Sequence, residues 1–307
     1  MITERAQAKI NLALHITGQR EDGYHLLDSL VVFADIGDRL DIAKAGITSL
    51  MIDGPQATGV PQDMSNSIMK AAELFLPQER GTAFTLTKNL PSAAGIGGGS
   101  ADAAAALRGL IRLWGDKSPK QLFLKGLQPD RLSAEDFQAL SDKVKALGAD
   151  VPVCLFSRTA RMHGIGEKLS FIDSMPPLRA VLVNPGVSVS TPEVFKAIAR
   201  KENEGLPDTR TDFADVGDYI AWLGGLRNDM ENAACQIAPV ISYALSQLEQ
   251  SAGCQLARMS GSGATCFGLY LDAKSAGEAA KAISATHPSW WVKACRLGTA
   301  RGTHPNG

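Results

Sequence analysis

The sequence lacks the features that mark several large classes of protein. No apolar run is long enough to cross a bilayer, and the N-terminal MITERAQAKINLALHI carries charges where a secretion signal needs an unbroken apolar core. The five cysteines show neither C-x-x-C spacing nor a paired histidine motif, so neither a zinc site nor a disulfide framework is predicted. These absences predict a soluble, cytoplasmic protein whose cysteines are core thiols in a reducing compartment.

An excess of charge of one sign is also missing. The 31 basic and 32 acidic residues give a formal net charge of -1 at pH 7. Proteins that bind nucleic acid or a membrane surface usually concentrate positive charge, so neither partner is predicted. A chain of 307 residues can form one large domain or two medium ones, each with a sizeable core. The sequence is silent on oligomeric state.

The main functional signal is PSAAGIGGGSADAAAALRGLIRLW, residues 91–114, a glycine-rich turn followed by an alanine-rich helix. Gly95 and residues 97–99 allow positive φ and leave no Cβ in the way of an approaching ligand. The helix expected over 101–114 begins with amides that have no internal partner, which favours an anion such as phosphate. A tight turn with close packing is the plain alternative, but three consecutive glycines exceed what one turn needs.

Two common nucleotide loops are excluded by what this stretch does not contain. It has no Lys-Ser/Thr for G-x-x-x-x-G-K-[ST], and Ser100 stands where the third glycine of G-x-G-x-x-G would be. The phosphate hypothesis therefore rests on the glycines and the helix start.

Near the N-terminus, AQAKINLALHI alternates as a strand, with Lys9 and Asn11 on the face opposite the aliphatic row. Those two side chains are surface residues if that face meets solvent and ligand groups if it lines a cleft. The loop 18–25 then ends in Tyr24 and His25, which form either an aromatic plug or a contact for a flat ligand. The sequence leaves both alternatives open.

The order of the expected elements indicates an α+β fold. Strands are expected over 30–33 and 39–43 around a turn at 35–38, and a helix starts near Ser65. Strands thus precede the glycine loop and a helix follows it, unlike an alternating βαβ array. We expect a first domain over 1–163 with the loop, a second over 164–297, and a tail over 298–307 whose lack of a pattern predicts disorder.

Three later stretches also carry candidate residues. In LGADVPVCLF, Asp150 stands beside an apolar segment, as a turn cap or as a base. In STPEVFKAI, Ser190 or Thr191 caps a helix with Phe195 near its start. MSGSGATCFGLYL is a second small-residue turn, followed by a strand, and a helix is expected over 237–250.

Taken in order, AKINLAL, DGYH, PSAAGIGGGSADA, LGADVP, STPEVF, NDMEN and MSGSGATCF resemble the GHMP kinases over roughly residues 6–271. The resemblance is to the branch that phosphorylates the 2-hydroxyl of 4-diphosphocytidyl-2-C-methyl-D-erythritol in the non-mevalonate isoprenoid pathway. It implies a ribosomal-protein-S5-like N-terminal domain, a ferredoxin-like C-terminal domain and an active site between them.

The resemblance also implies a role for individual residues in ATP binding and catalysis. Lys9 and Asp150 match the catalytic pair, and Asn66 and Lys88 match positions near the adenine. Mg²⁺ would accompany ATP, with Ser100 as the candidate ligand, because this ion keeps several waters and needs few protein groups. The residues matching the ATP phosphate loop are Pro91, Ala94, Gly95, Ile96, Gly97, Gly98, Gly99, Ser100 and Ala101.

Substrate contacts are implied in the same way. Tyr24 and Phe195 match cytosine contacts. The methylerythritol contacts are Asn11, His25 and Thr191, and the third family motif, shaping the same cleft, contains Gly261, Ser262 and Gly263. The sequence departs from many such kinases at residues 92–94, where Ser-Ala-Ala replaces glycines or a methionine and predicts a stiffer loop.

Three other functions compete with this one. A homoserine or mevalonate kinase would share the loop but have no use for Tyr24 and Phe195 as a pair. A non-catalytic nucleotide-binding protein would tolerate the loss of Lys9 or Asp150, and both are present. A nicotinamide-dependent dehydrogenase fits worst, because its glycine fingerprint is broken.

Overall fold

The computed structural model describes residues 1–76, 80–114 and 134–298, so all but the first residue of the predicted tail lies outside it. The chain forms two compact units that interleave along the sequence. The first unit contains Met1–Ala8, Gly37–Ser92 and Gly97–Ser157, and the second contains Lys9–Ile36, Ala93–Ile96 and Arg158–Gly307. The sequential division into 1–163 and 164–297 stays a prediction.

The sheet of the first unit is built on the second half of β2 (His25–Ala45), which pairs antiparallel with β4 (Gly81–Thr87). β3 (Ser49–Asp53) adds to β4 in parallel. The turn predicted at 35–38 is wrong, because β2 runs through it without a break. Asp35 and Asp38, which suggested a turn, instead accept backbone N–H groups of Arg296 and Asn89.

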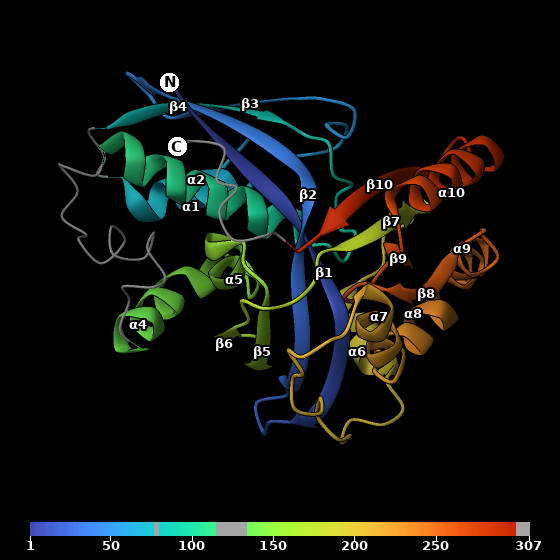
Figure 1. Ribbon diagram of the computed structural model, residues 1–307. Helices are drawn as coiled ribbons and strands as arrows, with labels where there is room; N and C mark the ends of the chain where they lie inside the picture. The colour runs from blue at the N-terminus through green and yellow to red at the C-terminus, as the bar shows by residue number, and fades with distance from the viewer. Residues whose placement is uncertain (77–79, 115–133, 299–307) are drawn as a thin grey trace. The chain divides into compact units, whose positions relative to one another are not determined.

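Helices α1 and α2 lie side by side in the first unit (Figure 1). α1 begins one residue later than a Ser65 cap would place it, because Asn66 accepts the N–H of Ile68. α2 begins at Gly98, three residues earlier than expected, since the carbonyl of Gly97 already accepts a helical bond. The helical segments of this unit are α1 (Ser67–Phe75), α2 (Gly98–Trp114), α4 (Ala134–Val144), η3 (Lys145–Leu147) and α5 (Val151–Phe156).

Antiparallel strands in the order β10-β7-β9-β8 form the centre of the second unit, and β10 also pairs with β2 at Leu297 and Ala34. Helices α9 and α10 pack against these strands and against each other (Figure 1). Three further helices precede α9 between β7 and β8; apart from them, strand, helix, two strands, helix, strand is the ferredoxin-like order, which confirms this part of the predicted α+β fold. These elements are β7 (Leu178–Asn184), α9 (Val240–Glu249), β8 (Cys254–Met259), β9 (Cys266–Tyr270), α10 (Ala273–Thr286) and β10 (Trp291–Leu297).

Strand β1 (Ile2–Gln19) has both faces buried along the part that belongs to the second unit. Lys9 is 5% exposed, Asn11 2% and His15 2%, so the face opposite the aliphatic row is interior rather than solvated. The helix predicted over 237–250 is wrong in its start, because two helices meet at 238–239. The remaining elements are β5 (Ala160–Gly164), β6 (Lys168–Phe171), α6 (Thr191–Ala197), α7 (Val216–Gly224) and α8 (Glu231–Ile237).

None of the helices in the described ranges combines the length and hydropathy needed to span a bilayer. All five cysteines are free thiols.

Candidate functional site

The first part of the glycine-rich loop, Ala93–Ile96, belongs to the second unit and is held there through its carbonyl groups. Gly95 O accepts the hydroxyl of Ser260 at 3.1 Å, and Ile96 O accepts the N–H of Lys9 at 2.9 Å. Gly95 has a φ of 72°, and a Cβ on it would lie 2.5 Å from the carbonyl oxygen of Ser260. Packing within the protein therefore requires glycine at this position.

The departure at residues 92–94 has a structural consequence at Ala93. This residue adopts a φ of 49°, in the left-handed region that glycine enters more readily than alanine. The loop therefore holds Ala93 in a backbone conformation that is less favourable for alanine than for glycine.

At the start of α2, in the first unit, glycine is not required by the protein's own packing. A Cβ on Gly98 would lie 3.4 Å from Lys88 Nζ, and one on Gly99 would lie 3.8 Å from Ser67 Oγ, neither of which is a clash. Within the described part of the chain, no acceptor bonds the amides of Gly98, Gly99 or Ser100. Free amides at a helix N-terminus, with no Cβ beside them, suit the phosphates of ATP.

Beneath this helix start lies a buried cluster of Lys88, Asp38 and Asp102. The ammonium of Lys88 contacts Asp38 Oδ2 and lies 2.8 Å from Asp102 Oδ2, and all three side chains are at most 5% exposed. Asp38 Oδ1 also accepts the N–H groups of Asn89 and Leu90 at 2.6 and 2.8 Å. The cluster thus ties the end of β4 and the chain entering the loop to β2 and α2.

The ionisation of this cluster follows from its burial. Burial raises the pKa of Asp102 to about 7 against the attraction of Lys88, and the negative charge of Asp38 adds to the rise. Burial alone would lower the pKa of Lys88, but the two carboxylates outweigh it and raise that pKa. Lys88 therefore stays cationic at neutral pH.

The two residues predicted near the adenine have other contacts in the structure. Lys88 belongs to the buried cluster, and the side chain of Asn66 caps α1 and donates to Pro61 O at 2.7 Å. Their contact with adenine stays a prediction.

Asp150 directly precedes α5, and its side chain makes no capping hydrogen bond to that helix. The turn before it packs closely on the helix that follows the glycine loop, because a Cβ on Gly148 would lie 3.0 Å from Ser100 Oγ. Within the first unit, the candidate base and the free amides of α2 therefore belong to adjoining turns.

In the second unit, Asn11 offers an unused acceptor. Its Nδ2 donates to Ser29 Oγ at 2.8 Å, and its Oδ1 is buried without a partner among the described residues. A Cβ on Gly261 would lie 3.4 Å from that Oδ1, so the glycine keeps the space beside it clear. A buried polar atom without a partner is costly, which indicates a bound group at this place.

The third motif contacts the start of α6. It is also held by Asn228, a residue that the sequence patterns did not single out. Thr191 Oγ1 and Ser262 Oγ lie 2.7 Å apart. Asn228 donates through Nδ2 to the carbonyl oxygens of Met259 and Gly261, both at 2.8 Å. The motif NDMEN contributed to the family resemblance without a role, and its first asparagine orients this loop.

A stacked pair of rings joins two predicted substrate contacts. The rings of His25 and Phe195 are 4.5 Å apart with an interplanar angle of 12°. His25 Nε2 is buried without a partner among the described residues, and burial, together with the charge of Lys201, lowers the His25 pKa. Tyr24, by contrast, is 61% exposed. The structure therefore groups His25, rather than Tyr24, with Phe195.

Lys9 lies in the second unit and Asp150 in the first. Their action as a catalytic pair stays a prediction.

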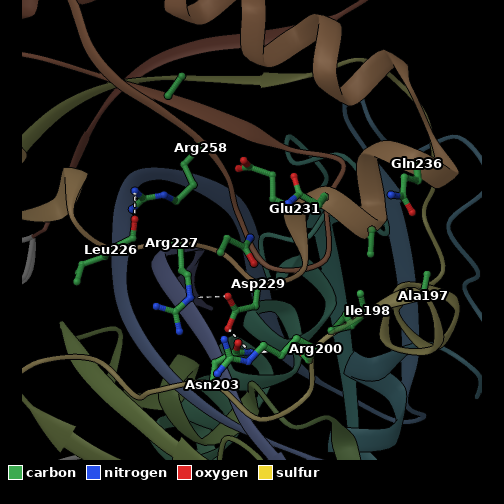
Figure 2. A pocket seen from close by; sticks show the side chains of 15 residues that line it. Ala197, Ile198, Arg200, Asn203, Leu226, Arg227, Asp229, Glu231, Gln236 and Arg258 are labelled. Carbon is green, nitrogen blue, oxygen red and sulfur yellow. Dashed lines mark hydrogen bonds and ion pairs between the residues drawn. The ribbon is translucent and has the colours of Figure 1, made fainter.

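A pocket of about 450 Å³ in the second unit contains none of the predicted site residues (Figure 2). On its wall, Arg227 Nε lies 2.6 Å from Asp229 Oδ1, and Arg258 donates to Leu226 O at 2.6 Å. Asn228, which bonds the third motif, also lines this pocket, so the pocket adjoins that motif. Its lining residues are Ala197, Ile198, Ala199, Arg200, Asn203, Leu226, Arg227, Asn228, Asp229, Glu231, Asn232, Ala233, Gln236, Ala257 and Arg258.

Two sequence families match consecutive parts of the chain. The GHMP kinases N terminal domain matches residues 66–158, and the GHMP kinases C terminal domain matches residues 194–289. The first contains the glycine loop and Asp150, and the second contains Phe195 and the third motif. The chain belongs to the GHMP kinase family.

Its relatives narrow the comparison to one branch of that family. A protein of Roseobacter denitrificans named 4-diphosphocytidyl-2-C-methyl-D-erythritol kinase is 48% identical over 96% of this chain and 93% of its own length. A kinase of the same name from Ruegeria pomeroyi is 51% identical over 93% of this chain and 95% of its own. A crystal structure of 4-(cytidine 5'-diphospho)-2C-methyl-D-erythritol kinase matches with a TM-score of 0.73 and 30% identity, covering 97% of this chain and 100% of the other.

Proposed function

We propose that this protein transfers the γ-phosphoryl group of ATP to the 2-hydroxyl of 4-diphosphocytidyl-2-C-methyl-D-erythritol, in the non-mevalonate route to isoprenoid precursors. One observation carries the kinase part of the proposal. At the start of α2, glycines that packing does not require flank amides that have no acceptor among the described residues, and the turn before Asp150 adjoins them. The cytidine part is supported by the names of relatives that are 48 and 51% identical to this chain.

Phosphoryl transfer needs alignment and charge stabilisation more than covalent help from the protein. The amides of Gly98, Gly99 and Ser100 would bind phosphate oxygens. Ser100 is also the candidate ligand for Mg²⁺, which would neutralise phosphate charge when bound and needs few protein groups. Its hydroxyl lies at the turn that precedes Asp150, which suits this assignment.

Asp150 would accept the proton of the attacking 2-hydroxyl. Lys9 would stabilise negative charge on the transferred group.

Recognition of the acceptor would use the uncharged groups of the second unit. The unpartnered Oδ1 of Asn11 can accept a hydrogen bond from a substrate hydroxyl, and Thr191 with Ser262 can orient the methylerythritol part. Phe195 would stack on the cytosine, with Tyr24 as the second ring. The contact of His25 with methylerythritol is kept in this proposal, although its stack on Phe195 also brings it within reach of the base.

The proposal is tested by incubating the protein with Mg-ATP and, separately, 4-diphosphocytidyl-2-C-methyl-D-erythritol, mevalonate and homoserine. ADP release is measured, and ³¹P NMR identifies the product. We expect turnover and a new phosphomonoester with the cytidine substrate alone. Turnover with mevalonate or homoserine would assign a sister kinase activity, and ATP binding without turnover on any acceptor would leave a non-catalytic nucleotide-binding protein.

A further inference from the structure

One side chain in the first unit connects three elements that lie far apart in the sequence. Arg108, on α2, donates from Nη1 to Cys154 O at 2.8 Å, from Nη2 to Arg5 O at 2.6 Å, and from Nε to Glu4 Oε2 at 3.0 Å. A planar guanidinium with five donors in a fixed fork can serve all three acceptors at once. Arg108 thereby links α2, the start of β1 and the end of α5.

The connection is largely buried. The side chain of Arg108 is 12% exposed and that of Glu4 is 6% exposed. Hydrogen bonds from a charged donor in such surroundings contribute more than those between neutral groups. We therefore treat this contact as a rigid one and not as a surface ion pair.

The short helix α5 depends on partners for its last carbonyl groups. It has six residues, from Val151 to Phe156, and isolated helices of that length are not stable. Its terminal carbonyls cannot bond within the helix. Cys154 O accepts from Arg108 and, at 3.0 Å, from Ser157 Oγ.

α5 runs along α2 in the same direction. At one end, Gly148 packs against Ser100, and at the other, Cys154 contacts Arg108. Fixing the second contact prevents α5 from sliding along α2. Asp150, at the beginning of α5, is thereby held in register with the free amides at the beginning of α2.

We propose that Arg108 is a positioning residue, which acts through α5 to hold the candidate base Asp150 against the phosphate-binding start of α2. This inference rests on the proposed kinase function for its effect on rate. Its structural part, the dependence of α5 on Arg108, does not.

The chain offers a matched control one turn further along the same helix. Arg112 Nη1 lies 2.9 Å from Glu4 Oε1, so both arginines pair with the same carboxylate, but among the described residues Arg112 has no hydrogen bond to α5. Arg108→Ala should lower kcat on the order of 10²-fold, the scale of a misplacement of about 1 Å, without changing the Kd for ATP. Arg112→Ala should leave both unchanged. Equal losses of kcat in the two variants would overturn the proposal.

A double variant separates positioning from general damage to the fold. If Arg108 acts through Asp150, then adding Arg108→Ala to Asp150→Asn should lower kcat little further. Full additivity of the two losses would contradict the proposal. Arg108→Lys, which keeps the charge but loses the fork, replaces Arg108→Ala if the alanine variant does not fold, with the same outcomes expected.

Hydrogen exchange supplies a test that does not depend on turnover. Amides of residues 151 and 153–157 should exchange faster in Arg108→Ala than in Arg112→Ala, while those of 101–107 in α2 should not differ. Unchanged exchange in α5 would overturn the proposal even if the wild-type protein phosphorylates the cytidine substrate. Faster exchange in α5 of Arg108→Ala, together with a wild-type protein that has no kinase activity, would support the structural link and reject the proposed function.

Discussion

The residues proposed to bind phosphate and those proposed to bind the acceptor differ in how their polar groups are partnered. The phosphate region, in the first unit, consists of the α2 start, the Lys88 cluster and the turn 148–150. The recognition region, in the second unit, consists of Asn11, His25, Thr191, Phe195 and residues 260–263. In the phosphate region the buried charged groups of Lys88, Asp38 and Asp102 contact one another, Asp102 Oδ1 has no partner among the described residues, and the backbone amides at the α2 start have no acceptor there. In the recognition region neutral side chains hold one another and leave single polar atoms free.

This difference matches the two kinds of ligand. A polyphosphate carries its own charge, and aligned amides at a helix N-terminus bind it without a bulky side chain. A base and a hydroxyl are neutral and are distinguished by stacking and by individual hydrogen bonds. Variants in the two regions should therefore affect different kinetic constants.

The largest effect is expected at the turn 148–150 of the phosphate region, which contains the candidate base Asp150. Asp150→Asn keeps the size of the side chain and removes the base, so kcat should fall on the order of 10²–10⁴-fold while both KM values change little. Steady-state kinetics measures this. Asp142→Asn, which removes an exposed carboxylate paired with Lys145, is the control. If Asp150→Asn retains most of its kcat, Asp150 is a turn residue only.

Within the phosphate region, Gly98→Val should weaken ATP binding. Its Cβ fits the protein, but the branched side chain would stand beside the free amides and obstruct one charge-assisted hydrogen bond. Such a bond contributes about 1.5–3 kcal/mol, or roughly 10- to 150-fold in Kd. Calorimetry measures the affinity and circular dichroism the fold. Gly277→Val is the control, on α10 with open space around its Cβ. Unchanged ATP affinity in folded Gly98→Val would remove this loop from the ATP site.

In the recognition region, Phe195→Ala should raise KM for the cytidine substrate and leave KM for ATP unchanged. Loss of a base stacked on an aromatic ring costs about 1–3 kcal/mol, or roughly 5- to 150-fold. Phe213→Ala, which removes another half-buried ring in tilted contact with aromatic neighbours, should change neither KM. A parallel rise of both KM values in Phe195→Ala would make Phe195 a packing residue and erase the difference between the two regions.

The smallest effect concerns the pH dependence of stability in the Lys88 cluster. The pKa of Asp102 is raised from 3.8 to about 7 in the folded protein, so between these values the folded state holds a proton that the unfolded chain releases. The stabilisation is complete below the lower value and is lost as pH rises through the higher one. Asp102→Asn is neutral throughout, so its Tm relative to wild type should increase between about pH 4 and pH 7. A difference in Tm that is constant or decreases over this range would show that Asp102 is ionised in the folded protein.

Local sequence patterns were sufficient for much of this molecule. The alternation in β1, the glycine loop followed by a helix, and the caps near α1 and α6 depend on neighbours within a few positions, and all were predicted within a few residues. The turn at 35–38 was wrong because Asp35 and Asp38 bond groups far along the chain, such as Arg296 and Asn89. Their turn-forming character is overridden by those contacts.

The amino-acid order alone specified the fold class and the glycine loop, because periodicity and glycine content are local properties. Within that loop, packing does not require the glycines at 98 and 99. Tertiary structure was needed to show that Lys9 and Asn11 face the interior, that His25 stacks on Phe195 and that Lys88 is enclosed by two carboxylates. It was needed above all for Arg108, whose partner Arg5 is 103 positions away. No local pattern encodes such a pairing, because it exists only once α2, β1 and α5 have packed together.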